Sequence, residues 1–241
     1  MYDSYASVYQ RIGQGAWSER MAHWSITWLR ERGINGGHVI DWGCGEGTAA
    51  MVFAAAGWQV IGVDRSDQML QLARQRNDRI RWQQGDLHDT RLDQIGTVAT
   101  AFYDTLNYLT TSDDLQAAWR TLAASIGLGG YVITDVNTPY EYESAWTGQY
   151  VITADRDDVL VLNRLRYNLD TRLATGRIIW FATDERETWQ RGSETHVQRA
   201  HTDEDMREAI EHAGLQLIER TTPQGSAPTA TSTRIIYIAR K

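Results

Sequence analysis

The feature that most constrains the fold is a short apolar segment that runs into a glycine-rich turn, Val39-Ile40-Asp41-Trp42-Gly43-Cys44-Gly45-Glu46-Gly47-Thr48. The residues before the glycines predict a buried strand, and the small and apolar residues from Thr48 to Ala56 predict a buried helix. Glycines let the backbone approach a ligand closely because they carry no Cβ atom. The free N–H groups at the start of the helix also suit a nucleotide-like cofactor, although three glycines alone are a weak signal.

Strand-like and helical segments alternate from residue 16 to residue 136. Such alternation implies a parallel sheet with right-handed crossovers. Gly127-Leu128-Gly129-Gly130 predicts a tight turn before the last strand of this series. The strands are expected at residues 38–42, 59–63, 80–84, 98–103 and 131–136, and the helices at 16–32, 48–56, 67–76 and 112–125.

The pattern changes between residues 137 and 200, where strand-like runs predominate. The linkers between these runs are turn-like, such as Asp155-Arg156-Asp157-Asp158 and Thr175-Gly176. We therefore expect a small antiparallel sheet inserted into an α/β core of residues 1–136 and 201–241. The core resumes with a helix at 203–213 and an antiparallel strand pair, 215–220 and 234–239, at the sheet edge. The runs of the insertion are 151–154, 159–169, 177–183 and 194–199.

Three acidic residues sharpen the prediction for the ligand. Asp64 ends the second strand, where a doubly wound sheet would let it accept both hydroxyls of a ribose. Asp86, in Gly85-Asp86-Leu87 after the third strand, could reach an adenine amino group. Asp41 stands just before the glycines, where its charge would repel a diphosphate but suit an ammonium and a sulfonium. This favours S-adenosylmethionine (SAM) over NAD.

The glycine turn with Asp64 and Gly85-Asp86-Leu87 resembles the motifs of class I SAM-dependent methyltransferases. Tyr103-Asp104-Thr105-Leu106-Asn107-Tyr108-Leu109 is similar to the segment after their fourth strand. The insertion, together with the opening Tyr2–Tyr9, is similar to a subgroup with glycine N-methyltransferases and amino-sugar N,N-dimethyltransferases. The resemblance implies a Rossmann-like, doubly wound sheet of seven strands with the last one antiparallel.

The resemblance also assigns site residues. It implies that the turn, with Gly43, Cys44 and Gly45, holds the methionine part of SAM and later of the product S-adenosyl-L-homocysteine. Further cofactor contacts are expected from residues that flank the adenine or close over the ligand: Tyr9, Trp17, Asp41, Asp64, Arg65, Asp86, Leu87 and Tyr103.

Composition narrows the class of partner. The formal net charge of −7 makes a nucleic-acid partner unexpected, and no apolar run approaches the roughly 20 residues that span a bilayer. The one cysteine, Cys44, excludes an internal disulfide and any metal site with several thiolates. Met1-Tyr2-Asp3-Ser4-Tyr5 does not resemble a signal peptide, so we expect a cytoplasmic protein.

The predicted function is methyl transfer to a small molecule, with an amine or a hydroxyl as acceptor. The candidate bases are His196, Tyr108 and Asp104, in that order, and no metal is expected. The inserted sheet would cover the site and set substrate choice. Two alternatives stay open, a catalytically silent SAM-binding protein and an NAD-dependent oxidoreductase, and the chain could act as a monomer or a homodimer.

Overall fold

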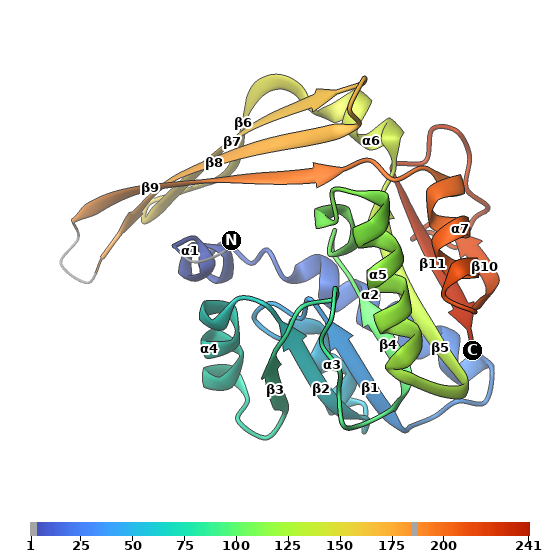
Figure 1. Ribbon diagram of the computed structural model, residues 1–241. Coiled ribbons are helices and arrows are strands. Elements are labelled where there is room, and N and C mark those ends of the chain that lie inside the picture. Colours follow the sequence, from blue (N-terminus) through green and yellow to red (C-terminus); the bar gives the residue numbers. More distant parts are fainter. Residues whose placement is uncertain (1–3, 185–187) are drawn as a thin grey trace.

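The computed structural model describes residues 4–184 and 188–241. Its core is a seven-stranded sheet (Figure 1). Its strand order is β10-β11-β5-β4-β1-β2-β3. The first five strands along the chain run parallel, whereas β11 pairs antiparallel with both β10 and β5. The expected seven-stranded sheet with an antiparallel last strand is confirmed. The strands are β1 (His38–Trp42), β2 (Gln59–Asp64), β3 (Arg81–Gln84), β4 (Gly96–Ala101), β5 (Ile126–Asn137), β10 (Gln216–Thr221) and β11 (Arg234–Arg240).

Helices cover both faces of this sheet, so its central strands are apolar on both sides. Alternate residues of β1 point to opposite faces: Val39 packs with α2 (Ala16–Glu31) and α3 (Thr48–Ala55). Ile40 and Trp42 pack with α5 (Ser112–Ala124) and α7 (Asp203–His212). Because these strands run parallel, their carboxyl ends lie along one edge of the sheet, where ligands bind in such folds.

The inserted region forms a second sheet of four antiparallel strands in the order β6-β7-β8-β9. It extends across the carboxyl ends of the core strands, above α1 (Ala6–Arg11) and near α4 (Asp67–Arg76) (Figure 1). One face is largely exposed, while Val159, Val161 and Trp180 pack on Tyr5, Tyr9 and Met69. The strands are β6 (Thr147–Arg156), β7 (Val159–Asn168), β8 (Leu173–Thr183) and β9 (Trp189–Arg199), preceded by α6 (Pro139–Ala145).

Two expected turns are wrong. Thr175-Gly176 lies inside β8, where both residues pair with β7. A Cβ at Gly176 would stand 3.3 Å from Leu165 Cδ2. The glycine here makes room for a cross-strand neighbour rather than a bend. Residues 127–130 lie inside β5, where a register shift between Gly96 and Val98 of β4 absorbs the extra residues. The short helix α1 was not expected from the sequence.

No helix in the described part of the chain is long and apolar enough to cross a membrane.

Candidate functional site

The glycine-rich turn connects β1 to α3 and needs its glycines for two reasons. Gly43, Gly45 and Gly47 all adopt left-handed φ values, 66°, 54° and 82°. A Cβ at Gly43 would stand 2.4 Å from Thr105 Oγ1, and one at Gly47 would stand 2.3 Å from the Trp82 ring. At Gly45, by contrast, a Cβ would meet no described atom within 4 Å. The turn is therefore packed from two sides and open at Gly45.

Asp64 ties this turn to the next strand. Its Oδ2 accepts a hydrogen bond from the Gly45 N–H and its Oδ1 accepts one from the Ser66 N–H, both at 2.8 Å. Burial raises the pKa of Asp64, and these N–H donors oppose that rise. Each carboxylate oxygen has a second acceptor site, so the group can still receive ligand hydroxyls.

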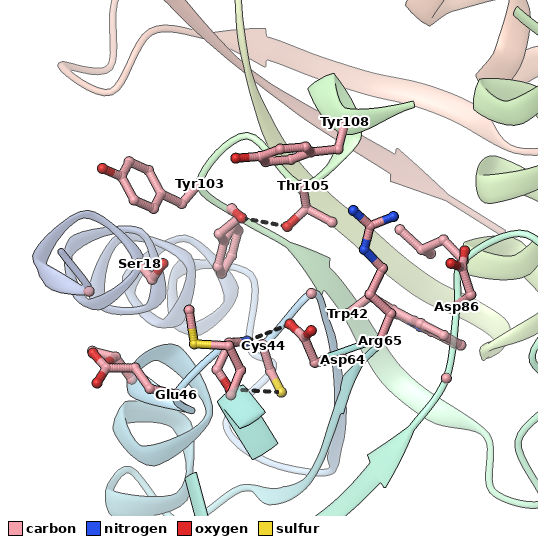
Figure 2. Close-up of a pocket in the computed structure, with 18 of the residues that line it drawn as sticks. Ser18, Trp42, Cys44, Glu46, Asp64, Arg65, Asp86, Tyr103, Thr105 and Tyr108 are labelled. Carbon is pink, nitrogen blue, oxygen red and sulfur yellow. Dashed lines mark hydrogen bonds between the residues drawn. The ribbon is translucent and has the colours of Figure 1, made fainter. Parts of the chain in front are cut away.

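A pocket opens over the turn, with about 920 Å³ of space that includes solvent at its mouth. Figure 2 shows Tyr103 and Tyr108 on one side of it, across from Cys44 and Asp64. Lining residues that the sequence did not single out include Ser18, Glu46, His88 and Thr105. The pocket brings together eleven residues named above as candidates or neighbours of the turn: Tyr9, Trp42, Gly43, Cys44, Gly45, Asp64, Arg65, Asp86, Leu87, Tyr103 and Tyr108.

Two predicted cofactor residues do not line this pocket. The Trp17 indole N–H donates to Asp135 Oδ2 at 2.9 Å, and its ring lines a neighbouring pocket. Asp41 is 2% exposed and accepts a hydrogen bond from the Thr100 hydroxyl at 2.7 Å. Burial raises the pKa of Asp41 to about 7. Because Asp41 does not line the pocket, its charge would act on a ligand through the protein interior rather than by contact.

Asp86 is part of a carboxylate–histidine–carboxylate arrangement at the rim. His88 Nδ1 lies 2.5 Å from Asp86 Oδ1, and His88 Nε2 lies 3.0 Å from Asp114 Oδ1. The hydrogen bond with Asp86 is the main reason that the pKa of His88 is raised. Burial would raise the pKa of Asp86, but the contacts with His88 lower it overall. This arrangement fixes the loop after β3 against α5.

Two of the candidate bases contact each other. Tyr108 Oη lies 2.8 Å from His196 Nδ1, and His196 Nε2 lies 3.2 Å from Glu194 Oε2. His196 is 3% exposed, and burial lowers its pKa more than Glu194 raises it. Because a carboxylate only accepts, the neutral imidazole carries its proton on Nε2, and the Tyr108 hydroxyl donates to Nδ1. Glu194 was not predicted, although it shares a face of β9 with His196.

The carboxylate of Glu194 also holds the start of the described chain. Its Oε1 accepts hydrogen bonds from the Ser4 N–H and hydroxyl, both at 2.9 Å, and from the Tyr5 N–H at 3.1 Å. The inserted sheet, the N-terminal segment and the pocket are thus joined through one side chain.

The third candidate base, Asp104, is held by an arginine. Asp104 Oδ1 accepts a hydrogen bond from Arg234 at 2.6 Å, and Arg234 also pairs with Asp135. Tyr103 and Asp104 both adopt left-handed φ values, 54° and 68°, and the Tyr103 N–H donates to Asp135 Oδ1 at 3.0 Å. This strained backbone brings Tyr103 into the lining of the pocket, whereas Asp104 lies outside the lining and is paired with Arg234. Arg234 was not expected from the sequence.

The residues present fit SAM. The turn is open at Gly45, Asp64 faces the pocket with free acceptor capacity, and Asp86 lies across the pocket from the turn (Figure 2). Among the described residues, no three or more His, Cys, Asp or Glu side chains are grouped so that they could hold a metal ion.

The sequence comparisons agree with this geometry. A family model described as a methyltransferase domain matches residues 39–130. YqeM of Bacillus subtilis (strain 168), provisionally described as a methyltransferase, is 26% identical over 246 residues, 100% of this chain and 97% of YqeM. The dTDP-3-amino-3,4,6-trideoxy-alpha-D-glucopyranose N,N-dimethyltransferase of Streptomyces venezuelae is 27% identical over 159 residues, 64% of this chain and 67% of that enzyme.

Solved structures share the fold. A SAM-dependent methyltransferase from Clostridium acetobutylicum ATCC 824 superposes with a TM-score of 0.87 and 21% identity, covering 99% of this chain and 98% of that one. SAM-bound CalS10, an amino pentose methyltransferase from Micromonospora echinaspora, gives a TM-score of 0.77 and 21% identity, covering 100% and 97%.

Proposed function

We propose that this chain transfers the methyl group of SAM to an amine. The chain is a class I SAM-dependent methyltransferase of small-molecule type, related to the amino-sugar N,N-dimethyltransferases. The observation that carries this proposal is the hydrogen-bonded chain Tyr108–His196–Glu194, which reaches the pocket over the glycine turn. The oxidoreductase alternative is set aside because the matching family model is a methyltransferase domain.

SAM supplies a methyl group that its sulfonium already activates. The protein's work is then to hold the ligand, align the acceptor and exclude water. We assign the holding role to Gly43, Cys44, Gly45 and Asp64, with Arg65, Asp86 and Leu87 around the adenine. Tyr9, 9% exposed, and Tyr103 would keep water away from the reacting centre.

The proton path favours an amine. An acceptor that arrives as an ammonium must lose a proton before its nitrogen can attack. Tyr108 Oη would take that proton while passing its own to His196 Nδ1, and the Glu194 carboxylate would stabilise the resulting imidazolium. A neutral imidazole can act as general base toward either group, but the proton of an ammonium is far more acidic than that of an alcohol, so the same base suits an amine better. Asp104, bound to Arg234 and outside the lining of the pocket, is not assigned the role of base.

The proposal is tested with radiolabelled SAM and matched acceptor pairs, such as glucosamine against glucose and other amines against their hydroxyl counterparts. We expect label in the amines and not in the alcohols. Label only in alcohols would refute an amine acceptor, and SAM binding without any label transfer would point to the catalytically silent alternative.

The proton path has its own test. Tyr108→Phe is expected to lower kcat roughly 100-fold while the Kd for SAM stays within threefold, in the range of a lost acid–base group. Because burial lowers the pKa of His196, kcat/KM of the wild type should fall only at a pH more acidic than the ordinary histidine range, where His196 becomes protonated, and this acid limb should vanish in His196→Gln. His23→Gln, at an exposed position of α2, is the control. The cytoplasmic location and the choice between monomer and homodimer stay predictions.

A further inference from the structure

A second pocket adjoins the first, and Tyr103 lines both of them. Its other walls come from Trp17, from Glu141 on α6, from Arg234 and from the loop that joins β10 to β11. This loop lies beside α6 (Figure 1), because the Thr138 N–H donates to Thr233 O at 3.0 Å and the Thr138 hydroxyl donates to Ser232 O at 2.6 Å. A molecule seated here would extend toward the reacting centre past Tyr103.

The loop presents hydroxyl groups to this pocket. Part of them serve the loop itself: Thr222 Oγ1 lies 2.8 Å from Ser226 Oγ, and Ser232 Oγ accepts from the Thr229 N–H at 2.9 Å. Thr231 and Thr233 are exposed at the pocket wall, and Thr231 Oγ1 lies 3.3 Å from Thr229 Oγ1, which leaves it capacity for a second hydrogen bond. Hydroxyls both donate and accept, so this wall can match the hydroxyls of a ligand in either sense. An apolar ligand would leave them unsatisfied.

Among the described residues, the lining of the second pocket holds one acid, Glu141, and one cation, Arg234, and two further carboxyl groups outside the lining pair with that cation. The side chain of Arg234 is 12% exposed, and its guanidinium is already paired with Asp104 and Asp135. Glu141 adds a third carboxyl group, whose pKa is raised by burial. The guanidinium of Arg20 lies 5.1 Å from the centroid of the Trp17 ring, but Arg20 is exposed and does not line the pocket.

The charged groups around the second pocket favour amines without phosphate over amines that carry one. A phosphate or diphosphate is bound by unpaired cations and N–H donors, and here it would meet a neutralised arginine and surplus carboxyl groups. An ammonium or a neutral hydroxyl-bearing group meets no such repulsion. The relatives include enzymes named for dTDP-linked amino sugars, so the prediction for this chain departs from them.

We propose that the second pocket binds the hydroxyl-bearing body of an acceptor amine that carries no phosphate, such as a free amino sugar or an aminoglycoside-like molecule. This inference rests on the proposed methyl transfer to an amine. It adds the place of the acceptor, held between Glu141 and the loop hydroxyls with its amine directed past Tyr103.

The experiment is calorimetric titration of the protein loaded with S-adenosyl-L-homocysteine. The probes are glucosamine and kanamycin A, with glucosamine 6-phosphate and UDP-glucosamine as their phosphorylated counterparts. We expect the unphosphorylated amines to bind at least tenfold more tightly. Glu141→Gln and Thr231→Val should each weaken that binding about three- to tenfold and leave SAM affinity unchanged. Glu143→Gln, exposed on the same helix, is the matched control.

The outcomes separate this inference from the proposed function. Tighter binding of the phosphorylated probes, absence of binding by all four, or binding indifferent to Glu141→Gln and Thr231→Val would overturn the inference, whatever the turnover. Binding that depends on Glu141 without label transfer from SAM to any amine would support the inference and refute the proposed activity.

Discussion

The core sheet and the inserted sheet contribute to one site in different ways. In the core, the glycine turn and Asp64 lie on adjacent strands, and their contacts are fixed by packing on both faces of the sheet. In the inserted sheet, one face is largely exposed, and β9 reaches the site with His196 and Glu194. Cofactor binding therefore depends on contacts within the core sheet. Proton transfer through His196 and binding of the acceptor depend instead on how the inserted sheet is placed over the core.

Matched glycine-to-alanine substitutions in the two sheets should differ in their effects on unfolding free energy and SAM affinity, with the larger losses in the core. In Gly43→Ala the new Cβ meets Thr105 Oγ1 at 2.4 Å and φ stays at 66°, so we expect a loss of roughly 3 kcal/mol in unfolding free energy. SAM affinity should fall with it. In Gly192→Ala the Cβ meets the Trp180 ring at 2.2 Å, with a loss of roughly 1–2 kcal/mol and little change in SAM affinity.

Denaturant unfolding and SAM titration of both variants measure this difference. Equal losses of SAM affinity in the two variants would contradict the division between the sheets.

His201, at the junction of the inserted sheet and the core, makes a smaller pH-dependent contribution. Burial lowers its pKa to about 4, and its Nε2–H donates to Leu106 O at 3.0 Å. Between the ordinary histidine pKa of about 6.5 and the lowered pKa of about 4, His201 is protonated in the unfolded chain but neutral in the folded one. The free energy of unfolding should therefore fall between about pH 6.5 and pH 4, by up to roughly 3 kcal/mol from this group.

The measurement is unfolding of wild type and His201→Gln at several pH values in this window. Their difference isolates His201 from Asp41, whose raised pKa acts with the opposite sign. A difference between the two proteins that does not change with pH would show that His201 is not buried as a neutral group.

Asp41 gives a prediction specific to the core. Its pKa of about 7 means that it ionises near neutrality, and an ionised carboxylate favours a cationic ligand. We expect SAM affinity to rise roughly three- to tenfold between pH 6 and pH 8, and this rise should be absent in Asp41→Asn. The same pH dependence in both proteins would remove Asp41 from the cofactor site.

The ion pair between α1 and the inserted sheet should have the smallest effect. Arg11 Nη2 lies 2.6 Å from Asp158 Oδ2, with both side chains partly exposed. Arg11 also donates to the Thr183 carbonyl and hydroxyl, so the pair is tested from its acidic side. Exposed pairs contribute little, so Asp158→Ala should lower the unfolding free energy by about 0.5–1 kcal/mol, and less at high salt. A loss several times larger would mean that α1 is the main anchor of the inserted sheet.

The sequence predicted what is local and left out what depends on long-range contacts. The strands, the glycine turn and Asp64 follow from periodicity and spacing within neighbouring segments. Tyr108 and His196 could each be named as candidates, but their contact depends on the lie of the inserted sheet, which no local pattern encodes. Arg234 was missed for the same reason, because its partners Asp104 and Asp135 belong to distant segments.

The prediction of turns at residues 127–130 and 175–176 was wrong because glycine serves two structural purposes. The same residue permits a bend or makes room for a neighbour, and only the packing of Gly176 against Leu165 reveals which one applies.

Calorimetric titration of SAM into Asp64→Ala and His196→Gln, side by side with wild type, tests the division between the two sheets most directly. Asp64→Ala should weaken binding roughly 100-fold, about 3 kcal/mol, because a buried charged acceptor is lost. Asp67→Ala, on the exposed start of α4, is the control. His196→Gln should bind SAM within threefold of wild type while its turnover falls. Wild-type SAM affinity in Asp64→Ala, or a 100-fold loss in His196→Gln, would contradict the account.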